Sequence, residues 1–553
     1  MSAPAWQELG RGLRVGTSGS LQIKGVERRG ALLVARIAAG AGYIVLEAPL
    51  GNAAGFWYPT SRLAPALPAD WWGRESFSAI KSAPVGALYD VDKTSGFAFA
   101  FDCVVDEGEL EFGVSEEGRV FVVRLGVSSR VGPVALAVVA DAQPYERAIR
   151  QLTGFLAAAQ RPVSRAATWP VYSTWYAHSQ RVTAEIIEAE ARMAVELGCR
   201  SVFIDDGWQQ HGTGRWYSGC GDWVPDPDKF PDLRATVDRL HGRGLDVVLW
   251  VAPLLVGERS EAGAALLAYS PVYVDGLRAR VLDPRRPEVR AHVAETCARL
   301  VRDYGVDGLK IDFLNNAMVY SGGEESVGRA MVELLREVAG AVGPGTLIEF
   351  RQPYVSPAVA EFADVIRAGD CPADADQNRR SIVNLRLFAA GQVVHSDPLM
   401  WDAAAGPEAA ARQVLGAFFG VPQLSMPLAS LPGAHRRVVA ELLAEWTALR
   451  EVILGGTLFA ALPAEGYPVV GVRRADELCV AAYEPRQLDL DLAGVTRLAV
   501  VNATAETALP YVLRGAAVRA SLRLPDGETR DLTLGERGFI PVPPWGIAHL
   551  TLG

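Results

Sequence analysis

The sequence predicts an α/β protein, in which a (β/α)8 TIM barrel is flanked by an N-terminal β-sandwich and a C-terminal β-domain. Strand-like segments alternate with amphipathic helical segments over residues 166–454, which is the pattern of a parallel barrel. The regions before and after it read as short β-rich runs without helical periodicity. A chain of 553 residues is also too long for one hydrophobic core. We therefore expect three domains, over residues 1–165, 166–454 and 455–553.

The N-terminal region is expected to be a β-sandwich, because it holds many short apolar runs separated by Gly, Pro and Asp. Its clearest strand candidates are residues 31–37, 41–49, 96–105, 118–127 and 134–140. The sequence pattern changes between Pro162 and Pro170, from short β-rich runs to alternating strands and helices, and the barrel is expected to begin there.

Eight strand candidates follow, with amphipathic helices between most of them. The clearest helix begins with Pro287 in its first turn and carries Val289, Val293, Cys297 and Leu300 at helical spacing. The count of eight treats residues 278–284 as part of a loop. A doubly wound open sheet is the rival architecture, but no GxGxxG motif or P-loop follows any strand. The strand candidates are residues 171–176, 201–208, 245–253, 306–313, 346–351, 364–370, 392–398 and 422–428.

Beyond residue 455 the chain again reads as strands, which predicts a second and smaller β-sandwich of about 100 residues. The strand candidates here are residues 456–462, 467–474, 478–485, 496–503, 520–527 and 546–553.

Composition excludes several classes of function. A net charge of -10 argues against nucleic acid as a partner. The six cysteines form no CxxC pair, and the seven histidines form no HxH or HxxxH pair, so neither a zinc site nor any other metal or cofactor is expected. No apolar run has the length of a signal peptide core or a membrane span. We expect a cytoplasmic protein without a membrane partner.

The most informative segment is Val306-Asp-Gly-Leu-Lys-Ile-Asp-Phe313. Side chains alternate along a strand, so Lys310 and Asp312 share one face. Burying both without partners would cost several kcal/mol per ion. A cation beside Asp312 would keep it ionised, as a carboxylate nucleophile requires. A buried structural ion pair is the alternative reading.

Charged or aromatic groups also end nearly every other predicted strand, and active sites of such barrels gather at these ends. The groups suit glycoside hydrolysis. Asp205 and Asp206 can accept sugar hydroxyls, and Trp175 or Trp250 can stack on a sugar ring. The chemistry also needs two carboxyl groups in opposite protonation states. Asp312 fits the ionised role, and Asp370, three residues after Arg367, is the candidate for the protonated one.

Five motifs resemble glycoside hydrolase family 36, in the alpha-galactosidase clan, and the length resembles its short bacterial type. They occur in the family's order and are IDDGW at 204–208, GDW at 221–223 with KFP at 229–231, LWVAP at 249–253, LKIDF at 309–313 and RAGD at 367–370. The resemblance implies a barrel between two β-domains and an enzyme that retains anomeric configuration by double displacement, often as an oligomer.

Carried onto this sequence, the resemblance implies that Asp312 is the nucleophile and Asp370 the acid/base. It further implies that five side chains contact the sugar or line its pocket, namely those of Trp175, Asp205, Asp206, Trp250 and Arg367. Lys310 belongs to the same motif as the nucleophile. An N-terminal aromatic residue can also reach the pocket in this family, so Trp57, Trp71 and Trp72 are candidates, with core packing as the alternative for each.

Two departures from the family pattern leave alternatives open. Arg351 stands where many members have a Cys-Gly-Ser-like stretch, so a bulky cation occupies a position that recognises the sugar. Asp374 and Asp376 compete with Asp370 for the acid/base role. The leading hypothesis is an alpha-galactosidase acting on terminal alpha-linked sugars. An alpha-glycosidase of other specificity, a transglycosylase and a non-catalytic carbohydrate-binding protein are the alternatives.

Overall fold

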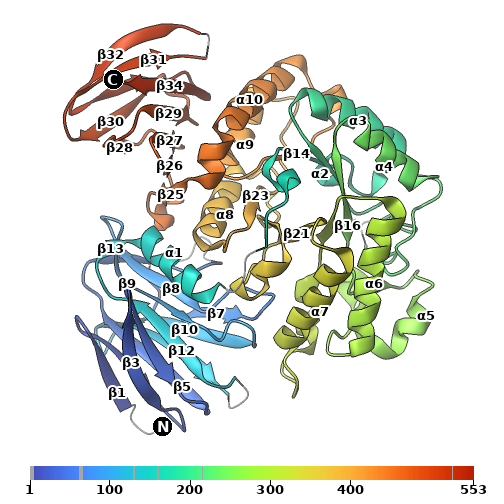
Figure 1. The fold of residues 1–553 in the computed structure, drawn as a ribbon, viewed down its shortest axis with the longest axis horizontal. Coiled ribbons are helices and arrows are strands. Elements are labelled where there is room, and N and C mark those ends of the chain that lie inside the picture. Colours follow the sequence, from blue (N-terminus) through green and yellow to red (C-terminus); the bar gives the residue numbers. More distant parts are fainter. Residues whose placement is uncertain (1–4, 61–66, 129–130, 158–160, 215, 526) are drawn as a thin grey trace.

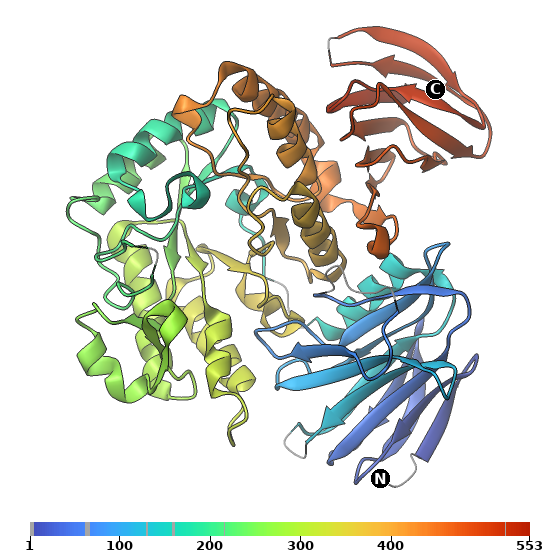
Figure 2. The ribbon, with the colours of Figure 1, turned by 180° about the vertical axis from the view of Figure 1, so that it is seen from behind.

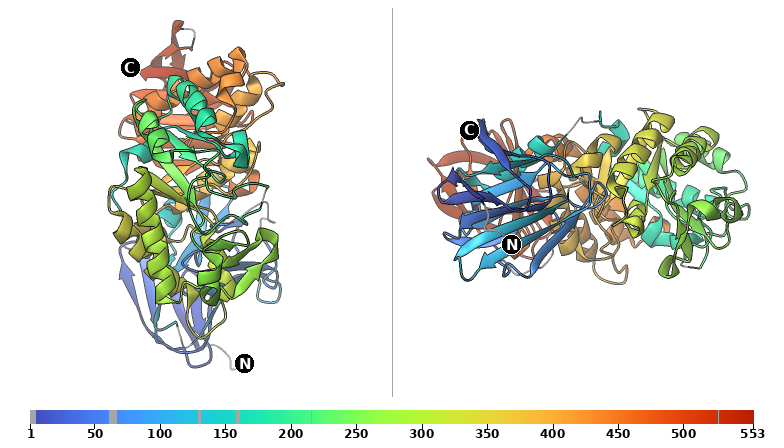
Figure 3. Two further views of the ribbon diagram at one scale, coloured as in Figure 1. Left: turned by 90° about the vertical axis from the view of Figure 1, so that its right-hand side faces the viewer. Right: turned by 90° about the horizontal axis from the view of Figure 1, so that it is seen from below.

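The computed structural model describes residues 5–553 except 61–66, 129–130, 158–160, 215 and 526. A central barrel lies on one side of the molecule, and the N-terminal and C-terminal β-rich units lie together on the other side (Figures 1 and 2). The view from below in Figure 3 shows the same division, with the barrel at one end.

The N-terminal unit is a sandwich of two antiparallel sheets, as the sequence predicts. One sheet has the order β1-β2-β5-β11-β10-β7 and the other the order β3-β4-β12-β9-β8-β6, with β13 paired to β9. Side chains such as Leu46, Phe99 and Phe121 fill the space between them. The strands are Ala5–Gly10, Leu13–Thr17, Ile23–Arg29, Leu32–Ile37, Gly42–Pro49, Ala53–Trp57, Gly73–Phe77, Val85–Asp90, Thr94–Phe101, Gly108–Ser115, Val120–Val127, Val134–Val139 and Gln143–Pro144. Helix α1 (Tyr145–Leu156) follows and packs on β8 and β9.

The barrel holds the eight predicted parallel strands, in the order β23-β22-β21-β20-β16-β15-β14-β24. Single bridges, from His395 to Val421 and from Leu399 to Leu424, join the two end strands. The (β/α)8 fold is therefore confirmed and the open doubly wound sheet is wrong. The strands are β14 Val171–Ser173, β15 Ser201–Ile204, β16 Asp246–Val251, β20 Gly308–Ile311, β21 Leu347–Arg351, β22 Val365–Arg367, β23 Val393–His395 and β24 Gln423–Leu424.

Helices cover the outside of the barrel. The predicted helix is α6 (Pro287–Tyr304), which buries Val289, Val293, Cys297 and Leu300 and ends at Gly305 in the left-handed conformation. None of the described helices is long and apolar enough to span a membrane. The other helices are α2 Trp175–His178, α3 Ala184–Glu196, α4 Leu233–His241, α5 Gly263–Leu266, α7 Val327–Val342, α8 Ala375–Phe388, α9 Glu408–Gly416 and α10 Gly433–Gly455.

An excursion between β16 and α6 contains the segment that the sequence assigns to a loop. Residues 279–281 form strand β19, which pairs with β17 (Leu255–Gly257) and β18 (Val272–Val274) in a small antiparallel sheet outside the barrel. The segment is therefore not one of the eight barrel strands, as predicted.

The C-terminal unit has a seven-stranded sheet in the order β25-β26-β27-β29-β34-β31-β32, facing a three-stranded sheet in the order β28-β30-β33. Leu488, Leu509 and Ile540 from the smaller sheet pack against Val500 and Leu550 from the larger one. The strands are Thr457–Ala460, Val469–Arg474, Glu477–Ala482, Leu488–Asp491, Arg497–Asn502, Ala508–Arg514, Val518–Arg523, Thr529–Leu534, Arg537–Pro541 and Gly546–Leu552.

Candidate active site at the strand ends

Strand β20 places Lys310 inside the barrel and Asp312 directly after the strand. Lys310 forms an ion pair with Asp205 from the end of β15, and both side chains are buried. Asp312 pairs instead with Arg351 at the end of β21, with 2.7 Å between Nε and Oδ1. The cation nearest to the proposed nucleophile is thus Arg351 and not Lys310.

Asp312 is held by a set of donors. Its Oδ1 also accepts the backbone N–H of Phe313 (2.6 Å), and its Oδ2 accepts Nε1 of Trp250 (3.1 Å). Burial alone would raise the pKa of Asp312. The charges of Arg351 and Lys310 and the indole hydrogen bond outweigh burial and lower the pKa below its ordinary value. Asp312 is therefore ionised, as a nucleophile must be.

Asp205 and Asp206 follow β15 at the turn closed by Gly207, whose φ of +117° favours glycine. Asp206 accepts hydrogen bonds from Gln180 Nε2 (2.6 Å) and Gln209 Nε2 (2.7 Å). Burial raises the pKa of Asp206 to about 6, despite both amide donors. The two adjacent carboxylates therefore differ: one is neutralised by Lys310 and the other is held by neutral amides.

The two predicted pocket tryptophans lie in different settings. Trp175 begins helix α2, beyond the end of β14, and its side chain is partly exposed. Trp250 is only 1% exposed, and its ring lies against Tyr217 and Trp223. The structure thus gives Trp250 a hydrogen bond to Asp312 in place of the open ring face that the sequence suggests.

Arg367 joins three strand ends. It donates to Asp397, which follows β23, and to Asp370 Oδ1 at 2.9 Å, and its Nε lies 3.7 Å from Glu349 on β21. The Arg351 Nη1 lies 3.9 Å from Asp370 Oδ2. One guanidinium, that of Arg351, therefore contacts both Asp312 and Asp370, and the structure brings the two predicted carboxylates to one place.

The charge on Asp370 differs from the expectation for a general acid. Burial would raise its pKa, but Arg367 and Arg351 outweigh burial and hold the pKa well below the ordinary value. With these partners both carboxylates are therefore ionised. The side chain of Asp370 is 51% exposed, so its surroundings can change when a ligand covers it.

The competing aspartates have structural partners. Asp374 is the N-cap of α8 and accepts the backbone N–H of Gln377 at 2.9 Å. Asp376 pairs with Arg379 and Arg412. Among the three, Asp370 is the one that approaches Arg351, the arginine paired with Asp312.

Four residues near the site are not predicted as site residues from the sequence. Tyr217 packs edge-on against Phe313, with 4.5 Å between ring centroids. The hydroxyl of Tyr354 donates to Ile311 O at 2.6 Å. Gln180 holds Asp206, and Lys229 donates to three backbone carbonyls nearby. Only Lys229 has a signal in the sequence, because it belongs to the KFP motif.

The three N-terminal tryptophans differ in burial. Trp57 is fully buried and donates to Asn384 on α8, so core packing is correct for it. Trp71 and Trp72 are 64% and 68% exposed. Within the described part of the chain, no group of three or more His, Cys, Asp and Glu side chains could hold a metal ion.

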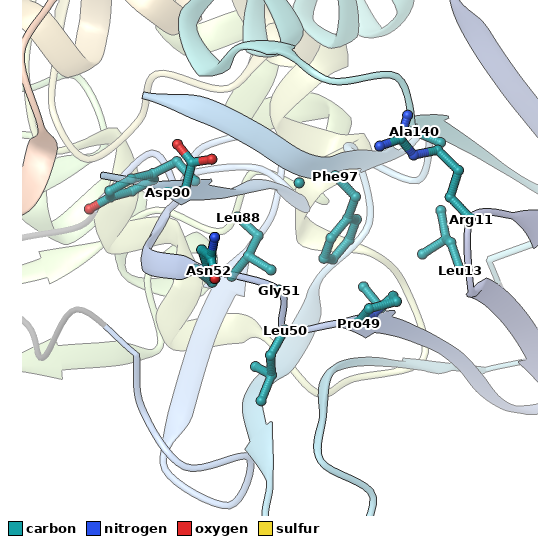
Figure 4. A pocket seen from close by; sticks show the side chains of 14 residues that line it. Arg11, Leu13, Pro49, Leu50, Gly51, Asn52, Leu88, Asp90, Phe97 and Ala140 are labelled. Carbon is teal, nitrogen blue, oxygen red and sulfur yellow. The ribbon is translucent and has the colours of Figure 1, made fainter. Parts of the chain in front are cut away.

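A cavity in the N-terminal sandwich lies away from the strand ends of the barrel. Figure 4 shows Arg11 and Asp90 on opposite sides of it, with Phe97 between them. The Oδ1 of Asp90 accepts two backbone N–H groups of its own turn, those of Asp92 and Thr94. The residues that line this cavity include no carboxyl group other than that of Asp90, so the cavity lacks the pair of carboxyl groups found at the candidate site.

The central region of the chain is similar to known sequences. Residues 145–333 match the family model described as Melibiase. Alpha-galactosidase 2 of Pediococcus pentosaceus is 30% identical over 148 residues, covering 26% of this chain and 20% of that protein. The bifunctional alpha-galactosidase/sucrose kinase AgaSK of Mediterraneibacter gnavus is 26% identical over 243 residues, covering 40% and 25%. The matched segments thus span about a fifth to a quarter of these relatives.

Comparison with solved structures covers the whole chain. The family 36 alpha-galactosidase AgaA of Geobacillus stearothermophilus matches with a TM-score of 0.65 at 15% identity, covering 98% of this chain and 81% of that one. The alpha-galactosidase of Lactobacillus brevis matches with a TM-score of 0.66 at 14% identity, covering 100% and 83%. Residues 145–333 are therefore similar to the melibiase family, and the fold of the chain is that of the glycoside hydrolase family 36 alpha-galactosidases.

Proposed function

We propose that this protein is a retaining exo-alpha-glycosidase that hydrolyses terminal alpha-linked sugars, with alpha-galactosides as its substrates. The observation that carries the proposal is the meeting of Asp312 and Asp370, from different strands, around one guanidinium. Retaining glycosidases need two carboxyl groups about 5–5.5 Å apart. Two carboxylates that contact the same guanidinium are compatible with that spacing.

In the first step Asp312 attacks the anomeric carbon and forms a glycosyl ester, while the bond from that carbon to the leaving oxygen breaks. Asp370 gives its proton to that oxygen. In the second step Asp370 takes a proton from water, and the water oxygen displaces the Asp312 carboxylate. The Oδ2 of Asp312 is the attacking atom in this proposal, because it accepts one hydrogen bond while Oδ1 accepts several.

The remaining site residues bind sugar hydroxyls in this proposal. Asp205 and Asp206 supply acceptors, Lys310 and Arg367 supply donors, and the partly exposed Trp175 supplies a ring face. Trp250 acts through its hydrogen bond to Asp312. Arg351 belongs to the same set as a further donor.

The test is to compare three variants on nitrophenyl alpha-galactoside and on an alpha-linked galactose disaccharide. Asp312→Ala is expected to lose nearly all turnover on both substrates. Asp370→Asn is expected to lose roughly 10²- to 10⁴-fold on the disaccharide, which needs protonation of its leaving oxygen, and less on the nitrophenyl substrate. Asp374→Asn is the matched control, because asparagine also caps helices and should leave activity unchanged.

Two results would contradict the proposal. Wild-type rates in Asp312→Ala would exclude this residue as the nucleophile. A larger loss in Asp374→Asn than in Asp370→Asn would move the acid/base to residue 374.

A second candidate function keeps the site and changes the sugar or the acceptor. Arg351 favours it, because a cation stands where the resemblance to family 36 implies small residues. Rates on the nitrophenyl alpha-galactoside and alpha-glucoside, with and without an acceptor sugar, separate hydrolysis of galactosides from another specificity and from transglycosylation. Sugar binding without hydrolysis of any alpha-glycoside would favour a non-catalytic binding protein.

The same proposal divides the chain into an N-terminal β-sandwich (1–165), a catalytic barrel (166–454) and a C-terminal β-sandwich (455–553). It places the protein in the cytoplasm, where a reducing environment suits six free cysteines. Assembly into a homo-oligomer belongs to the proposal too, and light scattering on the purified protein tests it.

A further inference from the structure

Asp397 is a buried carboxyl group beside the candidate site that the mechanism above does not use. It follows β23 by two residues, and its side chain is fully buried. Its Oδ1 accepts a hydrogen bond from Nη1 of Arg367. Its Oδ2 accepts the hydroxyl of Tyr176 at 2.9 Å and the backbone N–H of Cys371 at 2.7 Å. Both oxygens are therefore engaged, and one of the donors belongs to the residue directly after Asp370.

The guanidinium of Arg367 joins Asp397 to Asp370 through different nitrogens. Its Nη1 donates to Asp397, and its Nη2 donates to Asp370 Oδ1 at 2.9 Å. The side chain of Arg367 is 2% exposed, and those of Asp397 and Asp370 are 0% and 51% exposed. One buried positive charge is therefore shared by a buried carboxylate and by the more exposed carboxylate that the proposed mechanism uses.

An acid/base residue needs a proton that Arg367 makes hard to hold. Asp370 has to protonate the leaving oxygen, but a cation at 2.9 Å stabilises its ionised form. A second carboxylate on the same guanidinium counters this effect, because its negative charge offsets the positive one. The charge of Asp370 raises the pKa of Asp397, and the interaction between two charges is mutual. An ionised Asp397 therefore makes it easier for Asp370 to keep its proton.

We propose that Asp397 is a positioning residue for the acid/base Asp370. It offsets the charge of Arg367, so that Asp370 can give its proton to the leaving oxygen. It also fixes the chain beside Asp370 through the N–H of Cys371. The inference rests on the proposed function, and it assigns a role to a residue that acts only through its neighbours.

The surroundings keep Asp397 fixed and ionised near neutral pH. Asn378 on α8 holds its backbone twice, because Oδ1 accepts the Asp397 N–H at 3.0 Å and Nδ2 donates to the Asp397 carbonyl at 3.1 Å. Burial raises the pKa of Asp397 to about 6, and the charge of Arg367 and the two other donors limit that rise. The charged or titratable groups that face Asp397 are Arg367 of β22, Asp370 and Cys371 after that strand, and Tyr176 of α2.

The dependence on the leaving group separates this role from a structural one. We would measure kcat/KM at neutral pH on nitrophenyl alpha-galactoside and on an alpha-linked galactose disaccharide, and the pH profile of kcat on the disaccharide. Asp397→Asn is expected to lose roughly tenfold on the disaccharide, whose leaving oxygen must be protonated, and about threefold or less on the nitrophenyl substrate. The basic limb of the kcat profile reports the acid in the enzyme–substrate complex and should move about one unit to lower pH.

Three further variants complete the test. Asn378→Ala is the matched structural control, because it loosens the same segment and leaves every charge in place. It should lower both rates by a similar factor and leave the basic limb unmoved. Asp397→Glu keeps the charge and should keep the limb near its wild-type position. If Asp397→Asn folds poorly, Tyr176→Phe takes its place, because losing a donor favours the uncharged form of Asp397, and the limb should move the same way by a smaller amount.

Two outcomes count against these expectations in different ways. Equal losses on both substrates in Asp397→Asn, with an unmoved basic limb, would overturn the inference while the wild type still hydrolyses alpha-galactosides. A wild type that hydrolyses no alpha-glycoside would overturn the proposed function and, with it, this role of Asp397.

Discussion

Glu349 shows how a buried carboxyl group behaves when the neighbouring cations are already engaged. Its side chain is fully buried inside the barrel, and Oε2 accepts a hydrogen bond from Gln423 Nε2 at 2.8 Å. Its Oε1 has no hydrogen-bond partner among the residues that the structure describes and lies 3.7 Å from Arg367 Nε. Lys310 pairs with Asp205, and Arg367 with Asp370 and Asp397. Burial therefore prevails and raises the pKa of Glu349 to about 7.

The neighbouring histidine does not supply a positive charge. His395 Nε2 lies 2.7 Å from Ala167 O and donates to it, so Nδ1 is left to accept from Gln423 Nε2 at 3.0 Å. Burial lowers the pKa of His395 to about 4. Near neutral pH the ring is uncharged, and Glu349 is the group of this cluster that titrates there.

Glu349 gives the protein a predicted pH dependence of stability. Its folded-state pKa lies above the ordinary 4.5, so the folded protein binds the proton more tightly than the unfolded chain does. Its contribution to the free energy of unfolding is present at pH 4–5 and is lost as the pH rises through about 7. Glu349→Gln removes this loss. Relative to the wild type it should gain on the order of 1–3 kcal/mol at pH 8, and less at pH 5.

Urea unfolding at pH 5, 6, 7 and 8 would measure the difference. The exposed Glu116→Gln is the control and should show no such trend. A Glu349→Gln protein that loses the same stability at every pH would contradict the prediction, because the hydrogen bond from Gln423 would then matter more than the charge.

At the scale of elements, the barrel strands could be predicted because parallel strands are buried on both faces and read as apolar runs. Their ends could not be placed as well. The predicted strand 201–208 ends at Ile204, since the chain turns at Gly207, and the predicted strand 171–176 ends at Ser173, where α2 follows. In the C-terminal unit the predicted strands do not include β28, β30, β32 and β33. The sequence of β32 (Thr529–Leu534), TRDLTL, is largely polar and exposed, so it lacks the apolar pattern of a buried strand.

The geometry of the candidate site could likewise be predicted only in part from the sequence. Asp312, Asp370 and the Asp205–Asp206 pair could be found from their places after strands. The position of Arg351 could not, because it depends on strand register. Arg351 pairs in register with Arg367 on one side, which sets which carboxylates each guanidinium reaches. The sequence alone identifies the residue types at the site, but it does not give the strand register on which the distances between them depend.

The turn after β15 owes its shape to Lys229. The Nζ of Lys229 donates to the carbonyls of Gln180 (2.9 Å), Gly207 (2.8 Å) and Gly212 (2.8 Å). These three acceptors lie on both sides of Asp206, which Gln180 also contacts through its side chain. One ammonium group thus joins the α2 region to the turn that carries the two aspartates.

Lys229→Met should disturb sugar binding more than the chemical step. We expect KM for an alpha-galactoside to rise about tenfold, which corresponds to about 1.4 kcal/mol, because Asp206 loses its fixed position. The melting temperature should also fall, since a charged donor of this kind contributes roughly 1.5–3 kcal/mol. Steady-state kinetics and thermal unfolding measure both.

The control for this variant is Lys24→Met, since Lys24 makes a side-chain hydrogen bond to Gln22 at the exposed surface. It should leave KM and melting temperature unchanged. A Lys229→Met enzyme with lower stability and unchanged KM would restrict Lys229 to a structural role.

At the scale of the whole molecule, the two β-rich units are attached to the barrel by polar contacts as well as by the shared core. Glu107 of the N-terminal unit accepts the backbone N–H of Val327 at the start of α7, and Asp106 pairs with Arg329 on the same helix. Glu146 on α1 accepts the backbone N–H of Ala460 in β25. The barrel therefore does not stand apart from its neighbours.

Asn384 on α8 joins all three parts. Its Oδ1 accepts the indole N–H of Trp57 from the N-terminal unit at 2.9 Å and the hydroxyl of Tyr467, just before β26, at 2.5 Å. Both donors are buried. A single amide oxygen on the barrel thus satisfies one donor from each β-rich unit.

Asn384→Leu should therefore destabilise the whole molecule. Two buried donors lose their acceptor, at roughly 1–3 kcal/mol each, so we expect the free energy of unfolding to fall by about 2–5 kcal/mol. Tyr467→Phe, which leaves the Trp57 bond in place, should cost about 1 kcal/mol. The double variant should cost less than the sum of the two, because the hydroxyl that Asn384→Leu leaves without an acceptor is absent from it. Chemical unfolding of the four proteins measures this coupling, and strictly additive costs would show that Asn384 does not act as the common acceptor of both units.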